Sequence, residues 1–340
     1  MVRFAKIPRA RSPEVRRALV SLDGLDTELR AINLGAFVLW PLNERPTESD
    51  AARLGFEVVA LPDCKKLVYR NPFAEIKARL ALPLDHKRLL PRKWELVGDV
   101  LVLRIPQGMD GVKYKVAATY ADVLGAKTVC QEVGPIEGVF RIPKMNIIYG
   151  SDTETVHKEN GILYKLDVGK VMFSSGNKAE NLRMSHLDCR GETVVDMFAG
   201  IGYFTLPIAK HAHPKRVIAC EINPIAHRYL VENVELNDLR DVVEPFLGDN
   251  RGLPCDKIAD RVLMGYVGTT SEFLPKAFDL VKDGGVVHYH DVCPIELFPE
   301  RPLGEIRSRA NGRRFDVLRL AEVKSYAPLV SHYVIDIQVG

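Results

Sequence analysis

The chain has 340 residues, of which 46% are hydrophobic and 27% charged, and its formal net charge is +3. This length predicts two or three domains, and the composition is that of an ordinary globular protein rather than a disordered or fibrous one. The small net charge excludes a uniformly basic surface, so any nucleic-acid-binding face would have to come from local clusters of Lys and Arg.

The cysteines and the apolar segments further limit the class of protein to which the chain can belong. Six cysteines are scattered without a C-x-x-C pair, which fits neither a zinc site nor a disulfide framework, and we predict no bound metal. The basic N-terminus is not followed by the apolar segment of a signal peptide, and no stretch approaches the length of a transmembrane helix. These features predict a cytoplasmic protein with no membrane partner.

Residues 1–82 predict a small basic α+β module. A helix is expected over Pro13–Leu25, and short strands are expected over Ala36–Trp40 and Phe56–Leu61. Ser49 and Asp50 are plausible caps for a second helix that starts at Ala51. A solvated surface and a contact with RNA explain the positive charge of this module equally well.

Residues 83–185 predict a second α+β domain. It begins with Leu82–Trp94, a proline-rich and basic stretch that is typical of a boundary between domains. Thr153–Gly161 predicts a polar turn facing a neighbouring domain or RNA, because His157 and its flanking glutamates lack the spacing of a metal site. One helix and four strands are expected, in chain order, at Leu96–Ile105, Tyr114–Leu124 (the helix), Thr128–Val133, Asn146–Tyr149 and Ile162–Leu166.

From residue 186 onward, strands and helices alternate as in a doubly wound α/β domain. Val194–Phe204 reads VVDMFAGIGYF, so that an apolar strand ends in Asp196 and a turn with Gly200 and Gly202 leads into a helix. Such glycines let the main chain approach a nucleotide-like ligand. Asp196 would repel a pyrophosphate but suits the ammonium group of S-adenosylmethionine. By itself this stretch is equally compatible with a turn that binds no ligand.

Two later strand ends strengthen the prediction of a ligand site. Glu221 ends the strand that begins at Val217, and it follows the glycines at about the spacing at which an acid meets a ribose diol. Asp249 and Asn250 follow the next strand, where they can hydrogen-bond an adenine edge. The remaining strands are expected at 261–264 and 284–289, with a closing hairpin at 315–323 and 332–339.

Phe173–Glu180, FSSGNKAE, precedes the glycine-rich strand and is rich in hydrogen-bond donors. Ser174 and its neighbours are expected where the chain crosses the mouth of the α/β domain. A helix N-cap, with Glu180 closing a capping box, explains the same residues. The two interpretations are compatible, since free N–H groups at a helix start also bind carboxylates.

Several stretches together carry a specific resemblance. Residues 186–340 resemble the class I S-adenosylmethionine-dependent transferases, an α/β, Rossmann-like fold, here preceded by smaller α+β domains. From about Trp94 onward the chain is similar to two sister families of tRNA-modifying enzymes, the guanosine-37 N1-methyltransferases and the wybutosine-pathway aminocarboxypropyltransferases. The first eighty residues resemble either family only loosely. The matching stretches are VGDVLVLRIP, TETVHKENGILYKLDVGKVMFS, DMFAGIGYF, GDN and KSYAP.

Two motifs favour the aminocarboxypropyltransferases. The methyltransferases carry Asn-Pro-Pro or Asn-Leu-Pro after the fourth strand and Phe-Ser-Pro-Arg before the catalytic domain, whereas this chain has MGYVGTT at Met264–Thr270 and FSSGN at Phe173–Asn177. The resemblance thus implies transfer of the 3-amino-3-carboxypropyl group of S-adenosylmethionine to C7 of 4-demethylwyosine at position 37, in the anticodon loop of tRNA(Phe). An N1-methyltransferase and a catalytically silent tRNA-binding protein are the alternatives.

The resemblance also implies which residues contact the cofactor. The family often has Arg or Lys directly after Glu180, and the Asn181 found here leaves open whether Asn181, Lys178 or Arg183 makes that contact. No general base stands out, since Tyr266 and His290 are explained equally well as packing residues. The other implied contacts are Ser174, the glycine-turn residues Asp196, Phe198 and Gly200, Glu221 at the ribose, and Asp249 and Asn250 near the adenine.

Overall fold

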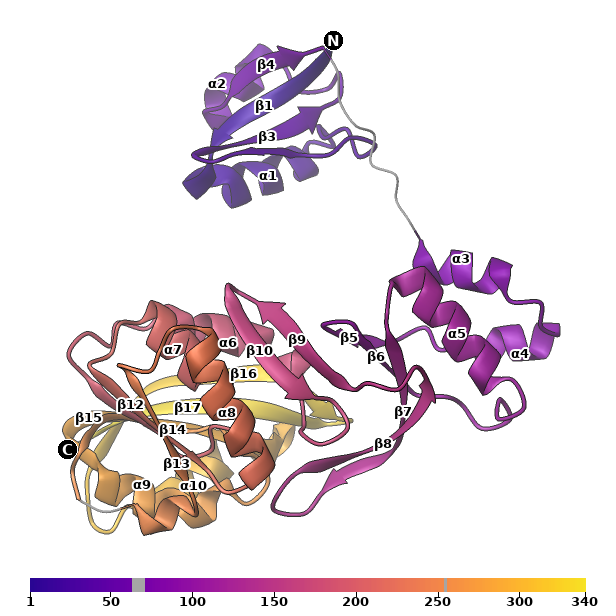
Figure 1. Cartoon of the computed structure of the whole chain (residues 1–340). Helices are drawn as coiled ribbons and strands as arrows, with labels where there is room; N and C mark the ends of the chain where they lie inside the picture. The colour runs from indigo at the N-terminus through magenta and orange to yellow at the C-terminus, as the bar shows by residue number, and fades with distance from the viewer. Residues whose placement is uncertain (63–70, 254–255) are drawn as a thin grey trace. The chain divides into compact units, whose positions relative to one another are not determined.

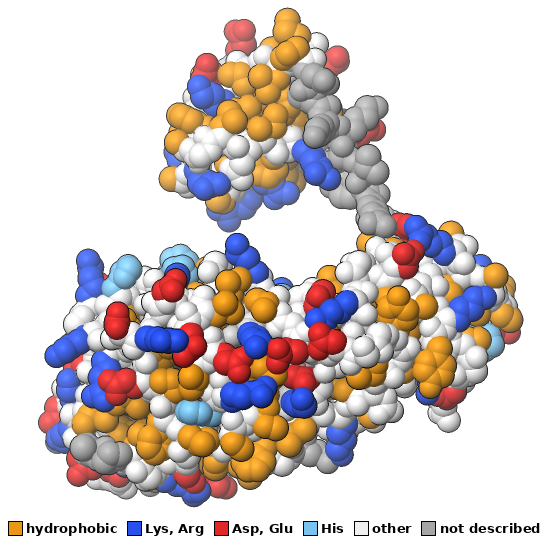
Figure 2. All heavy atoms as spheres, viewed as in Figure 1, with side chains coloured by type: hydrophobic (Ala, Val, Ile, Leu, Met, Phe, Trp, Pro, Cys, Tyr) orange, Lys and Arg blue, Asp and Glu red, His pale blue; other side chains and the backbone are white. Residues whose placement is uncertain are grey.

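The computed structural model describes residues 1–62, 71–253 and 256–340. These residues form two compact units, Met1–Pro72 and Phe73–Gly340, which are coloured along the chain in Figure 1. No helix among the described residues is long and apolar enough to cross a membrane. On the face of the second unit seen in Figure 2, basic and acidic side chains are interspersed rather than segregated, in keeping with the small net charge.

The first unit is an antiparallel sheet of order β2-β3-β1-β4 that packs against two helices. Its core includes Ile7 and Leu19. The second helix begins after Thr47, whose hydroxyl accepts from the amide of Asp50 in a capping box, so the predicted caps Ser49 and Asp50 are wrong by two to three positions. The elements are β1 Val2–Pro8, α1 Ser12–Ser21, β2 Ile32–Leu34, β3 Phe37–Leu42, α2 Glu48–Leu54 and β4 Glu57–Leu61.

The second unit begins with a sheet of order β5-β6-β7-β8 and three helices. Ile76 and Leu80 are fully buried against this sheet and α5, so the boundary predicted between residues 82 and 83 lies inside this unit. The predicted hinge Leu82–Trp94 instead contains α4. The elements are α3 Pro72–Arg79, α4 Leu84–Leu89, β5 Glu95–Val97, β6 Val100–Leu103, α5 Lys113–Leu124, β7 Thr128–Glu137 and β8 Ile142–Tyr149.

A two-stranded ribbon follows, formed by β9 Glu154–Glu159 and β10 Ile162–Asp167. The polar turn predicted over Thr153–Gly161 is therefore wrong, because most of it is strand β9. The turn is confined to Asn160 and Gly161, both of which have positive φ angles, 49° and 82°. Asn-Gly is the pair that a tight two-residue hairpin favours.

The rest of the chain is built around a seven-stranded sheet of order β13-β12-β11-β14-β15-β17-β16. Strands β11 to β15 are parallel, and β17 runs antiparallel between β15 and β16. The predicted α/β fold is confirmed. The strands are β11 Thr193–Asp196, β12 Arg216–Glu221, β13 Val243–Leu247, β14 Ala259–Met264, β15 Val281–Pro294, β16 Phe315–Ala327 and β17 Val330–Val339.

Helices cover both faces of this sheet (Figure 1). Neighbouring residues of a strand point to opposite faces, so Val194 packs in the core under α7 and α8, and Val195 packs in the core under α9 and α10. The strand order reverses between β11 and β14, and open α/β sheets bind ligands beside such a reversal, at the carboxyl ends of the strands. The helices are α6 Lys178–Ser185, α7 Thr205–His211, α8 Pro224–Leu236, α9 Leu274–Leu280 and α10 Glu300–Arg309.

The place of residues 73–82 in the second unit can be tested with two matched leucines. Leu80 is fully buried, whereas Leu84 is 63% exposed. We expect Leu80→Ala to lower the free energy of unfolding by about 2–5 kcal/mol because it leaves a cavity. Leu84→Ala should change it by less than about 0.5 kcal/mol. Urea unfolding of both variants measures the difference, and equal effects would contradict the assignment.

Candidate active site

A cavity of about 780 Å³ lies at the carboxyl ends of β11, β12 and β14. Its outer wall comes from the β7–β8 hairpin and from β16 and β17, so segments far apart in the sequence enclose it. Asn223, at the start of α8, donates to the carbonyl oxygen of Phe140 at 2.9 Å and thereby ties the hairpin tip to the cavity wall. The size is that of a pocket for a nucleoside-sized ligand.

The glycine loop between β11 and α7 forms one wall of this cavity. Gly200 and Gly202 have φ angles of 58° and 106°, and a Cβ at Gly202 would lie 2.6 Å from the side chain of Leu206. Glycine is therefore required here both by the backbone conformation and by close packing against α7. The loop thus places its main chain directly at the cavity.

Glu221 holds this loop to the next strand. Its Oε2 accepts from the Gly200 amide at 2.8 Å and its Oε1 from the Asn223 amide at 2.7 Å. Burial raises the pKa of this carboxyl group, although the two amide contacts oppose the shift. A carboxylate has further lone pairs, so Glu221, which lines the cavity, can still accept from the two hydroxyls of a ribose.

Asp196 is placed differently from the sequence-based prediction. It is buried below the loop and outside the cavity lining. Its oxygens accept from the Phe198 amide at 3.2 Å and from the Thr205 hydroxyl at 2.7 Å. Burial raises the pKa of Asp196 to about 6. In this structure Asp196 thus contacts the loop and the start of α7, and its predicted contact with a ligand ammonium group stays a prediction.

Asp249 and Asn250 both line the cavity at the end of β13. The Asn250 amide group donates to the carbonyl oxygen of Met197 at 2.8 Å, while its Oδ1 is buried with no hydrogen-bond partner in the described part of the chain. That oxygen can accept from a ligand N–H group. Asp249 instead pairs with Arg251 at 2.5 Å, and this hydrogen bond lowers the pKa of Asp249.

The segment before α6 borders the same cavity, through Ser174 and Asn177. The predicted capping box is wrong, because the N-cap residue Asn177 makes no side-chain cap bond and Glu180 is bound by Arg183 instead. Sequence reasoning placed Asn177 in the donor-rich turn at the mouth of the α/β domain but assigned it no contact with the cofactor. Its Oδ1 is buried without a partner among the residues that the structure describes, so it too is available to a ligand donor.

The three alternatives for a contact after Glu180 lie outside the cavity lining. Asn181 is buried and donates to Glu159 at 3.1 Å. Arg183 is held by Glu180 and Asp336. Lys178 borders a neighbouring groove together with Arg92 and Lys93. Which of the three contacts the cofactor therefore stays open.

The two weak candidates for a base differ in their surroundings. Tyr266 lines the cavity and stacks on Phe198, with ring centroids 5.1 Å apart, and the Arg141 guanidinium lies 5.4 Å from the Tyr266 ring centre. His290 is fully buried and does not line the cavity. Its neighbour His332 does line it, and sequence reasoning missed this residue.

These residues fit S-adenosylmethionine. The Glu221 carboxylate can accept hydrogen bonds from a ribose diol. The unpartnered side-chain oxygens of Asn250 and Asn177 can accept hydrogen bonds from donors such as an adenine amino group or an ammonium group. Phe198 offers an aromatic face beside them. No group of three or more potential metal ligands occurs among the described residues.

The altered role of Asp196 predicts a pH dependence of stability. In the folded protein its pKa is about 6, whereas an unfolded Asp has a pKa of about 3.9. Between these values the folded state binds more protons, so the free energy of unfolding contributed by this group falls as the pH rises. We expect Asp196→Asn to gain stability relative to the wild type from pH 4 to pH 7, by up to about 3 kcal/mol.

Urea unfolding at several pH values measures this gain, with Asp241→Asn at an exposed position as the matched control. A difference between Asp196→Asn and the wild type that stays constant over this range would show that Asp196 is not held protonated by burial.

Comparison with known proteins identifies the family. The TRM5/TYW2 methyltransferase domain matches residues 155–318, and the TYW2 N-terminal domain matches residues 76–153. The chain is 46% identical to tRNA(Phe) (4-demethylwyosine(37)-C(7)) aminocarboxypropyltransferase of Pyrococcus horikoshii, over 76% of this chain and 93% of that one. It is 35% identical to tRNA (guanine(37)-N(1))-methyltransferase Trm5b of Pyrococcus abyssi, over 100% of both chains.

The fold comparison agrees. The crystal structure of P. horikoshii TYW2 in complex with MeSAdo has a TM-score of 0.72 and 42% identity, over 78% of this chain and 98% of that one. The resemblance predicted from the sequence motifs is thereby confirmed. This chain belongs to the TRM5/TYW2 family.

Proposed function

We propose that this protein transfers the 3-amino-3-carboxypropyl group of S-adenosylmethionine to C7 of 4-demethylwyosine at position 37 of tRNA(Phe). The proposal depends on the rim of the cavity after β14. In place of an Asn-Pro motif, the rim carries Gly265 and Tyr266. Tyr266 stacks with the Phe198 ring, and the Arg141 guanidinium lies over the Tyr266 ring. Flat aromatic and guanidinium groups stack well on bases, and a tricyclic base offers a large face.

The residues of the chain supply binding and orientation. Glu221 and Asn250 hold the nucleoside part of the cofactor, while the cofactor itself supplies an activated carbon next to its sulfonium sulfur. Which carbon is delivered depends on which one faces the bound base. A rim without an Asn side chain aimed at a ring nitrogen leaves space for the longer amino-acid arm.

The anticodon loop of tRNA(Phe) is the proposed partner. Four cationic side chains line the cavity, and they can contact phosphates around an inserted base: Arg104, Arg141, Arg251 and Lys324. The cytoplasmic location predicted from the sequence stays a prediction.

One observation favours a second candidate, a guanosine-37 N1-methyltransferase. Trm5b of P. abyssi matches this chain over its full length, first unit included, whereas the P. horikoshii aminocarboxypropyltransferase covers 76% of it. The higher identity of the latter and the match of residues 76–153 to the TYW2 N-terminal domain support the first candidate.

Mass spectrometry of tRNA separates the two. Incubation with labelled S-adenosylmethionine should add an aminocarboxypropyl-sized mass to tRNA(Phe) that carries 4-demethylwyosine, and no mass to tRNA that carries unmodified guanosine. A methyl-sized gain on guanosine 37 would establish the methyltransferase instead.

Glu221 provides a test of cofactor binding. We expect Glu221→Gln to raise the dissociation constant of S-adenosylmethionine about 10- to 100-fold, because a charged hydrogen-bond acceptor is lost. Glu244→Gln, on the neighbouring β13 with an exposed side chain paired to Arg216, is the matched control. Calorimetric titration measures both. A wild-type protein that binds no S-adenosylmethionine would favour the catalytically silent tRNA-binding protein.

A further inference from the structure

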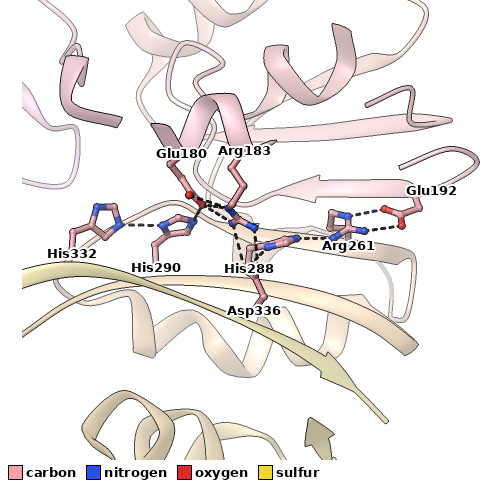
Figure 3. Close-up of polar contacts among 8 residues, drawn as sticks. All are labelled: Glu180, Arg183, Glu192, Arg261, His288, His290, His332 and Asp336. Atoms are coloured by element: carbon pink, nitrogen blue, oxygen red, sulfur yellow. Dashed lines mark hydrogen bonds and ion pairs between the residues drawn. The ribbon is translucent and has the colours of Figure 1, made fainter. Parts of the chain in front are cut away.

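Two histidines connect the cavity to a buried set of charged side chains (Figure 3). His332, on β17, lines the cavity although it is only 3% exposed. Its Nε2 lies 3.1 Å from Nδ1 of His290 on the neighbouring strand β15. The two are diagonal neighbours in the antiparallel pair, which brings such side chains within reach of each other. His290 in turn stacks on Phe204.

Behind the histidines, Arg183 links two carboxylates. It donates to Glu180 at 2.9 Å from Nε and to Asp336 at 2.8 Å from Nη1. Nε2 of His290 lies 3.5 Å from Oε1 of the same Glu180. All of these groups are buried or nearly so. Polar side chains in close succession therefore lead from the cavity wall to an arginine that holds two acids, although Nε2 of His290 makes no hydrogen bond with the described residues.

The far end of the path contains a second arginine. Arg261 donates to Nε2 of His288 at 2.8 Å and to both oxygens of Glu192 at 2.7 and 2.9 Å. Because a guanidinium only donates, Nε2 of His288 must accept, so its proton is on Nδ1, which donates to Asp336 at 2.6 Å. Burial also lowers the pKa of His288. His288 is therefore neutral.

The charges around the two histidines are nearly balanced. The network contains three carboxylates and two guanidiniums besides its three histidines (Figure 3). The Lys324 ammonium lies close enough to His332 to lower the pKa of that ring, and it offsets the remaining formal negative charge. Burial, together with His332 and Arg183, holds the pKa of His290 well below its usual range. Both rings are therefore neutral at neutral pH.

The tautomers of the pair follow from their neighbours. If His290 directs its Nε2–H at Glu180, its Nδ1 accepts from the Nε2–H of His332. Nδ1 of His332 then carries a lone pair, and no hydrogen bond to that atom is found in the described residues. Burial, together with the charge of Lys324, lowers the pKa of His332 to about 4, so the ring is neutral at pH 7.

We propose that His332 is the base that accepts the proton leaving the modified ring carbon, and that His290 is a positioning residue that orients the His332 ring. This inference rests on the proposed function. Tyr266 is a poorer base because a neutral phenol must lose its own proton first, and Glu180 does not line the cavity.

The transfer forms one C–C bond and breaks one S–C bond. The ring carbon C7 gives an electron pair to the γ-carbon of the aminocarboxypropyl group, a C–C bond forms, and the S–C bond breaks with its electron pair left on sulfur. C7 then carries four single-bonded neighbours, and the ring is cationic. Nδ1 of His332 takes the hydrogen as a proton, and the C–H electron pair returns to the ring. Since aromaticity is restored, that proton is strongly acidic, and a weak base is sufficient.

His332→Asn is the direct test, and His227→Asn on α8 is the matched control, since His227 lies outside the cavity lining and the network. We expect His332→Asn to slow the transfer about 100-fold while the dissociation constant of S-adenosylmethionine and the melting temperature stay unchanged. With substrate tRNA deuterated at C7, this variant should show a primary isotope effect that the wild type lacks, because proton loss becomes rate-limiting. His332→Gln, which keeps a contact with His290, serves if the Asn variant does not fold.

A measurement on the wild type completes the test. Nitrogen-15 NMR of labelled histidine should show a neutral His332 with its proton on Nε2, and a proton on Nδ1 at neutral pH would overturn the proposal. A folded His332→Asn protein with near-wild-type transfer and no isotope effect would overturn it as well. If the wild type itself forms no aminocarboxypropyl product, the proposed function fails, whereas an active wild type with an equally active variant refutes only the role of His332.

Discussion

The site depends on the way two carboxylates hold the glycine loop. Amides in such a turn lack the partners that a sheet or helix would give them, and buried backbone donors must be paired. Asp196 pairs the Phe198 amide from below, and Glu221 pairs the Gly200 amide from the side. Both acids lose solvation, which is why both pKa values rise. The loop is consequently in its binding shape before a ligand arrives, and little conformational entropy is lost on binding.

Sequence reasoning found the strands of the α/β sheet and most of the polar residues at their ends. It succeeded there because a parallel sheet brings the carboxyl ends of its strands to one edge. A local sequence pattern at each strand end is then enough to predict that residues far apart in the sequence lie close together. Glu221 and Asn250 meet at the cavity for this reason. Asp196 lies at the predicted end of β11, but its observed contacts could not be predicted from the sequence. Its carboxylate bonds back to Thr205, a residue of the following helix, and such a contact is decided by packing.

The errors come from interactions between distant parts of the chain. Pro83 and the basic residues after it resemble a linker locally, yet Leu80 is buried beneath α5, some forty residues further along the chain. His332 reaches the cavity only because β17 returns antiparallel beside β15, and the strand pattern does not state which register the hairpin adopts. The error at Asn160-Gly161 is of another kind, because the Asn-Gly pair that favours a tight hairpin can be recognised in the sequence alone.

The two arginines pair with all three carboxylates of the buried network. Arg183 bonds both Glu180 and Asp336, and Arg261 bonds Glu192 while fixing the tautomer of His288. Removing either arginine would leave a buried carboxylate without its cationic partner, which is costly in a medium of low dielectric constant. The paired charges hold this polar part of the core in one arrangement, and the contact of His290 with His332 orients the His332 ring. Since Nε2 of His332 is occupied by that contact, Nδ1 is the atom of this neutral ring that can accept a proton.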